Sequence, residues 1–340
     1  MRLNDFCGGM SDMNLTRQPS KTPLRAEGER TMKAEKRGTL SWRIAREWQK
    51  NYMLYLMFLP IFIYFLLFAY KPMYGVLMSF QDYKPSLGFL HSKWVGLKHF
   101  KTFFGGFYIG RLMWNTVYIS LCSLVFGFPA PIILALLINE VQQKQFKKAI
   151  QTISYLPHFI SLVVVCGMIK KFTLDTGVIN DLIALLGGTR KTLLNDPNWF
   201  IPVYIISDIW QEVGWGSIIY LAALSGVDTE LYDAARIDGA GRWKQTLHVT
   251  LPGIAPTIII MLILRMGGIL GVGYEKIILL YNPLTMKRAD VIASYVYREG
   301  LQNQKWSYST AVGLFNSVVN LVFLLITNAI SKRVSDTALW

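Results

Sequence analysis

Long apolar stretches constrain this chain more than any other feature of its sequence. An α-helix needs about 20 predominantly apolar residues to cross the hydrocarbon core of a bilayer. The first such stretch begins at Tyr52 and carries no charge, and no small-residue cleavage site of a signal peptide follows it. Six stretches meet the length requirement: residues 52–70, 113–139, 150–169, 199–224, 254–272 and 310–330. The sequence therefore predicts an all-α integral membrane protein with six transmembrane helices.

The composition agrees with membrane spans and excludes other classes of chain. Hydrophobic residues make up 52% of the 340 residues and charged residues 16%, whereas a soluble domain carries roughly 25% charged residues. An aromatic content of 14% excludes disorder, because it gives a strong drive toward burial. Of the three cysteines, Cys122 and Cys166 lie inside apolar stretches, so a disulfide scaffold is excluded as well.

The basic residues are unevenly distributed along the chain. The net charge is +14, and eleven of the 35 Lys and Arg residues precede Tyr52. A polar, basic arm ahead of a span is typical of a cytoplasmic N-terminus. No groove-reading or base-stacking module accompanies the charge, so we expect no nucleic-acid partner.

The arm also orients the predicted spans. An even number of spans places both termini on one side, so the arm (residues 1–51) and the tail (residues 332–340) are expected in the cytoplasm. The cytoplasmic segments then hold nineteen Lys and Arg residues and the outer loops fifteen. This margin comes from the arm, because the short loops alone do not decide the orientation. We expect a multi-pass protein of the cell membrane, with its membrane domain over residues 52–331.

Residues 226–253 form a distinctive polar segment between the fourth and fifth predicted spans. The segment reads GVDTELYDAARIDGAGRWKQTLHVTLPG and is too polar to cross a membrane. Acidic residues in an early turn, followed by paired alanines, favour a first short helix. Gly239 interrupts this pattern, and a second short helix is expected from Arg242 to Thr250, ending at Leu251-Pro252. Two short helices joined at a glycine predict a compact knob in the cytoplasm.

This segment resembles the EAA loop of the integral membrane subunits of ATP-binding-cassette importers. The family pattern is Glu-Ala-Ala, three residues, Gly, nine residues, Ile, any residue and Leu-Pro. The chain has Asp-Ala-Ala at residues 233–235, Gly239 after three residues, and Val-Thr-Leu-Pro at residues 249–252 after nine more. The spacing matches throughout, and the two departures, Asp for Glu and Val for Ile, keep the charge or the shape. The segments IDGA and LHVTLP make the resemblance more specific, because they are similar to those of the carbohydrate importers within this family.

The resemblance extends along nearly all of the chain after the arm. YLPHFIS at residues 155–161, GVIN at 177–180 and GYEKIILLYNP at 273–283 are similar to permeases for oligosaccharides and polysaccharide fragments. The resemblance implies a permease domain with the type I importer fold and a cytoplasmic coupling helix. A second permease subunit, forming a heterodimer, would complete the pathway. Two cytoplasmic ATPase subunits would drive it, and an extracytoplasmic sugar-binding protein would deliver the sugar.

The same resemblance assigns contact with the ATPase to eight residues of the loop. They are Tyr232, Asp233, Ala234, Ala235, Asp238, Gly239, Leu251 and Pro252. The sequence contains no Walker A pattern. We therefore expect no cofactor on this chain, with ATP bound and hydrolysed by the partner ATPase subunits.

Ionisable side chains within predicted spans are candidates for the substrate pathway. Asp208 and Glu212 lie four residues apart and so share one face of a helix. Ionisable groups in a span usually face a cavity or the bundle interior. The two acids either form a polar wall of the pathway, or hydrogen-bond between helices, or lie near the outer end of the span. Arg265 either lines the same cavity or pairs with one acid, while Trp210 and Trp215 either contact the sugar or pack between helices.

An enzyme is the competing class of function. A serine protease within the membrane needs a nucleophile and a base on another helix. Residues 214–217 (Gly-Trp-Gly-Ser) resemble a glycine-flanked serine, but spans five and six contain no histidine, so we expect no enzyme. His91, His99, His158 and His248 lack the spacing of a metal site. The alternatives that stay open are a permease for a non-sugar solute and a membrane-embedded enzyme acting on polysaccharide or lipid.

Overall fold

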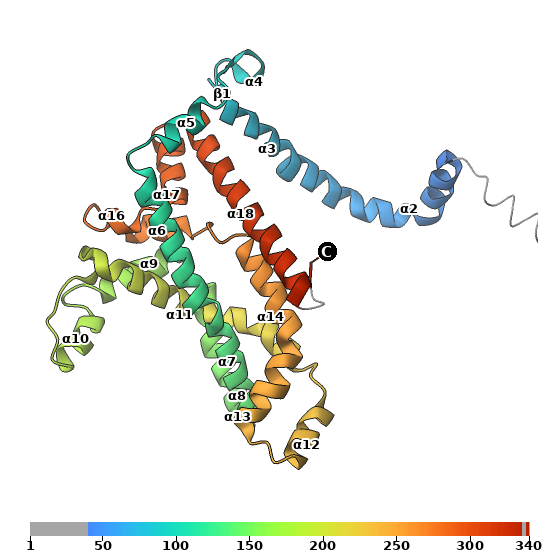
Figure 1. Ribbon diagram of the computed structural model, residues 1–340, viewed down its shortest axis with the longest axis vertical. Coiled ribbons are helices and arrows are strands. Elements are labelled where there is room, and N and C mark those ends of the chain that lie inside the picture. Colours follow the sequence, from blue (N-terminus) through green and yellow to red (C-terminus); the bar gives the residue numbers. More distant parts are fainter. Residues whose placement is uncertain (1–39, 335–337, 340) are drawn as a thin grey trace, which may run out of the picture. The chain divides into compact units, whose positions relative to one another are not determined.

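A computed structural model describes residues 40–334 and 338–339 of the chain (Figure 1). The chain divides into two compact units, Met1–Met73 and Tyr74–Trp340. Most of the predicted arm, residues 1–51, and part of the predicted tail lie outside the described residues. The boundaries predicted for the arm, the permease domain and the tail stay predictions.

The described part of the first unit is a single helical segment. α2 (Leu40–Phe65) continues through a π-helical turn, η1 (Leu66–Tyr70), into α3 (Lys71–Met73). α2 bends at Asn51, whose backbone angles (φ −122°, ψ 21°) are not helical. The predicted span 52–70 falls inside the apolar helix Glu47–Phe80, in whose most apolar window no residue is buried. A helix that is apolar on all sides and unburied is typical of a membrane span.

The second unit is almost entirely helical. Its first part contains a two-stranded antiparallel sheet, in which Gln81 faces Trp94 and Asp82 faces Lys93. From Tyr74 to Asn195 the elements are η2 (Tyr74–Phe80), β1 (Gln81–Asp82), α4 (Gly88–His91), β2 (Lys93–Trp94), α5 (Lys98–Phe104), α6 (Ile109–Cys122), η3 (Ser123–Gly127), α7 (Pro129–Glu140), α8 (Lys144–Tyr155), η4 (Leu156–Phe159), α9 (Leu162–Phe172), α10 (Val178–Leu185) and η5 (Leu193–Asn195).

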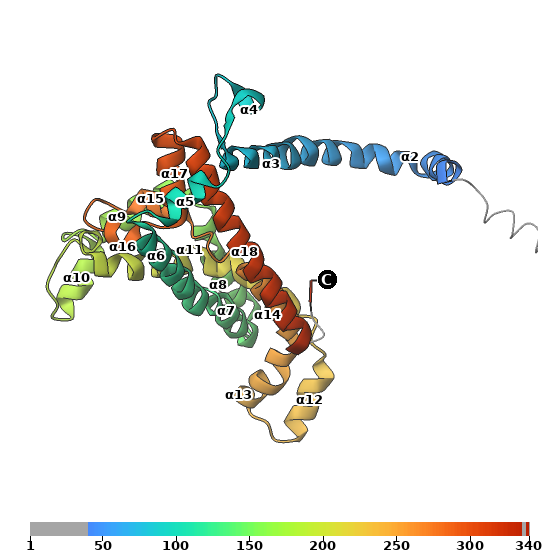
Figure 2. The ribbon, with the colours of Figure 1, turned by 45° about the horizontal axis from the view of Figure 1, so that its top comes forward.

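The rest of this unit carries the central helix and the polar loop. The elements are α11 (Pro197–Leu224), α12 (Thr229–Ile237), α13 (Arg242–Gln245), η6 (Thr246–Thr250), α14 (Leu251–Met266), α15 (Tyr274–Leu280), α16 (Met286–Ala289), α17 (Ile292–Tyr297), η7 (Arg298–Gln302) and α18 (Trp306–Val334). Figures 1 and 2 show α12 and α13 at one end of this unit and α4, α5 and α17 at the other.

The apolar helices confirm an all-α membrane protein. Within the described part of the chain, four helices are long and apolar enough to cross a membrane: Glu47–Phe80, Ile109–Glu140, Arg242–Met266 and Trp306–Arg333. A fifth candidate is the pair Lys144–Phe159 and Leu162–Phe172, bent by 100°. α11 has 28 residues but is not among these candidates, and Asp208 and Glu212 lower its hydropathy. The count of six spans stays a prediction.

The third predicted span is a broken helix rather than a continuous one. α8 ends at Tyr155, a 3₁₀ turn covers Leu156–Phe159, and α9 begins at Leu162. Pro157 has no backbone N–H to donate, and the extended backbone of Ile160 (ψ 134°) and Ser161 (ψ 135°) redirects the chain. The bend therefore turns polar side chains of the break toward α11.

The predicted end of the second loop helix at Leu251-Pro252 is wrong. α13, η6 and α14 run together from Arg242 to Met266. Pro252 follows directly on a π turn, where the regular pattern of backbone hydrogen bonds is already interrupted, so the helix tolerates the N–H that proline lacks. The wide π turn at Thr246–Thr250 precedes it. The polar loop is thus continuous with a membrane-spanning helix.

α11 is the central helix of the second unit. It packs against α7, α8 and α14. Phe200 and Tyr204 of α11 share a buried cluster with Ile119 of α6, Val165 of α9 and Ile277 of α15. This packing fixes which faces of α11 are left to line cavities.

Candidate coupling loop and substrate pathway

The first loop helix, α12, is defined by local capping at both ends. The Asp228 carboxylate accepts a hydrogen bond from the Glu230 N–H at 2.9 Å, which caps the N-terminus. At the C-terminus the Gly239 N–H donates to the Arg236 carbonyl (3.0 Å) and the Ala240 N–H to the Ala235 carbonyl (2.8 Å). This pair of bonds is a Schellman motif. Gly239 has φ +74°, a left-handed conformation that favours glycine.

Of the residues predicted to contact the ATPase, some are exposed on the knob and others are half-buried. Asp233 and Arg236 form an ion pair at 3.0 Å with both side chains exposed, and Ala234, Asp238, Gly239 and Pro252 are exposed as well. Tyr232, Ala235 and Leu251 are half-buried. The Tyr232 hydroxyl donates to the Thr250 Oγ1 at 3.0 Å. Tyr232 therefore ties α12 to the helix that continues into α14.

The sequence analysis did not single out two apolar side chains of this loop. Ile237 is 86% exposed and Trp243 76% exposed, and they flank the turn at Gly239. These two exposed apolar side chains, on either side of one turn, are candidates for contact with another protein. The signal was present in the sequence, because both residues interrupt an otherwise polar run.

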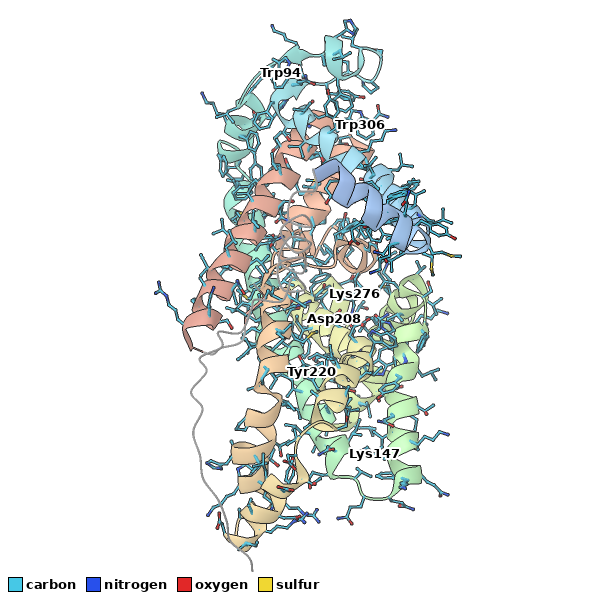
Figure 3. All side chains as sticks on the ribbon, turned by 90° about the vertical axis from the view of Figure 1, so that its right-hand side faces the viewer. Trp94, Lys147, Asp208, Tyr220, Lys276 and Trp306 are labelled. Atoms are coloured by element: carbon cyan, nitrogen blue, oxygen red, sulfur yellow. The ribbon has the colours of Figure 1, made fainter. Side chains whose placement is uncertain are left out.

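A polar cavity on α11, named here the α11 cavity, brings the two predicted acids together. Its volume is about 470 Å³, and Tyr204, Asp208, Gln211 and Glu212 of α11 line it with Glu275 and Lys276 of α15. The Lys276 Nζ lies 3.2 Å from the Asp208 Oδ1. The Lys276 side chain is 4% exposed, against 34% for Asp208. Figure 3 shows this pair between Trp306, toward one end, and Lys147, toward the other.

Of the two roles expected for Arg265, pairing with an acid is not observed among the described residues, and Arg265 does not line the α11 cavity. The cation that pairs with Asp208 is Lys276, which follows the predicted span 254–272 in the sequence. α14 ends at Met266, and α15 returns the chain to α11. In the part of the chain that the structure describes, the exposed Arg265 pairs with neither acid.

Glu212 has a partner that the sequence did not indicate. The His158 Nδ1 lies 2.9 Å from the Glu212 Oε2, although 54 residues separate the two. The His158 ring stacks on Trp215, with centroids 4.5 Å apart and planes 3° apart. His158 lies in η4, at the break between α8 and α9, so this contact joins the break to α11.

The two tryptophans of α11 do not line the α11 cavity. Trp215 packs on His158, and Trp210 lines a separate apolar cavity of about 480 Å³ with Val165 and Trp199. Both rings are nearly half exposed, at 44% for Trp210 and 46% for Trp215. The α11 cavity instead offers a hydroxyl, an amide, carboxylates and an ammonium group. Such a set hydrogen-bonds a polar solute, and no group of side chains among the described residues has the make-up of a metal site.

Known proteins resemble this chain over most of its length. The chain is 47% identical to Protein LplB of Bacillus subtilis (strain 168) over 302 residues, which cover 88% of this chain and 94% of that protein. It is 45% identical to the polygalacturonan/rhamnogalacturonan transport system permease protein YteP of the same organism, over 91% of this chain and 95% of that protein.

A solved structure is similar in fold and sequence. It is the crystal structure of a bacterial ABC transporter involved in the import of the acidic polysaccharide alginate. The matched chain has a TM-score of 0.80 and 46% identity, with 86% of this chain and 99% of that chain covered. A second structure of that kind of transporter includes the periplasmic protein bound to an alginate pentasaccharide, with a TM-score of 0.81 and 46% identity over 87% of this chain and the whole of that one.

These similarities confirm the resemblance of the chain to importer permeases and exclude the enzyme alternative. Residues 127–336 match the family described as the inner membrane component of binding-protein-dependent transport systems. That range includes the coupling loop, the α11 cavity and α18. The chain is a multi-pass membrane protein and belongs to the family of inner membrane components of binding-protein-dependent transport systems.

Proposed function

We propose that this chain forms part of the transmembrane pathway for an oligosaccharide or a polysaccharide fragment. The observation that carries the proposal is the α11 cavity, whose polar side chains are held on a membrane helix by partners from α15 and η4. Polysaccharide transport in the names of similar proteins supports the choice of solute. A polar solute in a membrane needs a lining of this kind, because it must replace the hydrogen bonds that water gives.

The partners and the orientation follow from the coupling loop. We place residues 226–253 in the cytoplasm, against one of two ATPase subunits that bind and hydrolyse ATP. A second permease subunit completes the pathway, and an extracytoplasmic binding protein delivers the saccharide. The solved transporter with its periplasmic protein supports the last of these partners. Both termini then lie in the cytoplasm.

The loop is suited to transmit motion from the ATPase to the spans. The exposed turn at Gly239 and the apolar side chains of Ile237 and Trp243 offer a contact surface. The hydrogen bond from Tyr232 to Thr250 fixes α12 to the helix that continues into α14. A displacement of α12 therefore moves a membrane-spanning helix that packs against α11.

Uptake by purified complexes tests the solute. The full complex in proteoliposomes, supplied with its binding protein and ATP, is expected to accumulate trisaccharides of galacturonate or of glucose. Accumulation of an amino acid mixture in their place would contradict the proposal. A variant complex with an ATPase that cannot hydrolyse ATP is the control for passive leakage.

Cysteine labelling tests the orientation separately. In a background without Cys7, Cys122 and Cys166, an impermeant reagent added to intact cells is expected to label Ser86→Cys and Asn195→Cys. The same reagent is expected to label Gln143→Cys and Lys244→Cys only after the membrane is opened. Labelling of Lys244→Cys from outside would refute the cytoplasmic placement of the coupling loop.

A further inference from the structure

The end of the second unit opposite the coupling loop contains another polar cavity. Its volume is about 530 Å³, within the range of about 300–1,000 Å³ typical of small-molecule sites. Residues 82–83, residues 98–106 and residues 295–308 contribute to its walls. Figure 3 shows Trp306 toward this end. We call this cavity the aromatic pocket and define it by Asp82, Tyr83, Lys98, Gln304, Trp306 and Tyr308.

The walls of the aromatic pocket are held in place without a ligand. The Tyr83 N–H donates to the Ser307 Oγ at 2.8 Å, which joins the segment after β1 to the start of α18. The hydroxyls of Tyr295 and Tyr308 lie 3.1 Å apart and share a hydrogen bond. A site that is already arranged loses less conformational entropy when a ligand binds.

Three polar groups of the pocket are left for a ligand. Within the described residues, the Asp82 carboxylate, the Lys98 ammonium and the Gln304 amide make no intramolecular hydrogen bond or ion pair. Gln304 has φ +56° and is the one non-glycine residue of the described chain with positive φ. Such a conformation persists only where its surroundings impose it, and it is frequent at ligand sites.

This combination matches the two chemical surfaces of a pyranose. The ring has an apolar face of C–H groups and a rim of hydroxyls, and the pocket pairs aromatic faces with free donors and acceptors. We propose that the aromatic pocket binds one pyranose unit of the transported saccharide, stacked on Trp306 and hydrogen-bonded by Asp82, Lys98 and Gln304.

This inference rests on the proposed function, because the cytoplasmic coupling loop places the aromatic pocket outside the cytoplasm. The pocket shares no lining residue with the α11 cavity. It is therefore a separate subsite, which meets the saccharide before the α11 cavity does. Its free groups include one acid and one base, so neutral and uronate units both find partners there.

Saturation-transfer NMR on the complete complex tests the subsite. The complex is used in lipid nanodiscs without its binding protein, and the probes are trisaccharides of galacturonate and of glucose. At least one probe is expected to bind the wild-type complex. Trp306→Ala is expected to weaken that binding by about three- to tenfold, the range for one stacking contact. Lys98→Ala is expected to weaken it by about tenfold or more, the effect of one charged hydrogen bond. Trp306→Phe should retain most of it.

Trp94→Ala is the matched control. Trp94 lies at the same end of the unit, is 60% exposed and does not line the pocket. Its replacement should leave binding of both probes unchanged. Unaltered binding in Trp306→Ala and Lys98→Ala, or no binding to the wild-type complex, would overturn the inference.

Two further measurements separate the competing outcomes. If Trp306→Ala lowers only the stimulation of ATP hydrolysis by the binding protein, the pocket is a docking surface for that protein and the sugar subsite is refuted. If the wild-type complex accumulates no saccharide in proteoliposomes, the proposed function itself fails. If the wild-type complex transports normally and Trp306→Ala binds the trisaccharides as tightly as the wild type, only the subsite is refuted.

Discussion

The coupling loop and the α11 cavity are built by different kinds of interaction. In the loop, the cap at Asp228 and the turn at Gly239 use hydrogen bonds between residues at most five apart. In the cavity, the Asp208 pair spans 68 residues and the Glu212 pair 54. A short-range arrangement can be read from spacing, whereas a long-range one depends on how the helices pack.

The largest effect is expected where α11 meets α8. A Cβ on Gly214 would lie 2.0 Å from the carbonyl oxygen of Ser154, and a backbone atom cannot move aside as a flexible side chain can. Small residues allow such close approach of membrane helices. Gly214→Ala is expected to cost about 3 kcal/mol or more and to remove most of the assembled complex.

The yield of complex after detergent extraction measures this effect. Gly167→Ala in α9 is the matched control, because a Cβ there meets no atom within 4 Å. A normal yield for Gly214→Ala would show that the helix packing around the α11 cavity is looser than described.

A coupling variant should separate transport from assembly. Gly239→Glu places a large charged side chain at a backbone position with φ +74°, on the exposed turn of the loop. The left-handed conformation alone costs a non-glycine residue roughly 1–2 kcal/mol. We expect the variant to remain in the membrane, to lose uptake and to bind the ATPase weakly.

Uptake and co-purification of the ATPase, at matched expression, report on this variant. Gly241→Ala is the control, since Gly241 has φ −68° and open space around its Cβ position. Normal uptake by Gly239→Glu would remove the coupling role from this loop.

Removing Lys276 alone and removing both members of its ion pair with Asp208 should change the yield of the complex differently. Lys276→Met leaves the Asp208 carboxylate without a partner, and breaking a buried pair costs about 3–5 kcal/mol. Because Asp208 is 34% exposed, the loss should fall below that range but still reduce the yield. The double variant Lys276→Met/Asp208→Leu should recover the yield and remain poor in uptake.

Uptake and complex yield are measured side by side for these variants. Arg265→Met is the control, because the exposed Arg265 pairs with neither acid. Full uptake by the double variant would show that the pair is structural and does not line the pathway.

The smallest effect is expected at the N-terminal cap of α11. The Asn198 backbone N–H, at 2.9 Å, and the Lys191 ammonium, at 3.0 Å, lower the pKa of Asp196. A lowered pKa contributes stability that is present above the unfolded value of about 3.9 and is lost as the pH falls through the folded value. The contribution is small, because solvent screens the exposed carboxylate.

Thermal unfolding of the purified complex as a function of pH tests this contact. Asp196→Asn should lower the stability slightly near neutral pH and leave it unchanged at a pH below the folded pKa of Asp196, which flattens the acid side of the curve. A change of equal size at all pH values would assign the effect to helix capping rather than to charge.

The sequence predicted the structure of the coupling loop more completely than that of the α11 cavity. It placed Gly239 at the junction of two short helices, and it put Asp208 and Glu212 on one face of α11. It missed Lys276 and His158, because neither lies near the acids in the sequence. It also ended a helix at Leu251-Pro252, where the helix instead continues through a π turn into α14.

The sequence by itself determined the membrane environment, the spacing of the coupling loop and the pairing of its helices at a glycine. These depend on apolar length and on the φ that glycine allows, both of which are local properties. Only the tertiary structure decided which cation pairs with Asp208 and where His158 meets Glu212. It also decided that neither Trp210 nor Trp215 lines the α11 cavity. The physical reason is that those contacts arise where α15 and the bend between α8 and α9 pack against α11, and packing joins residues without regard to their separation in the chain.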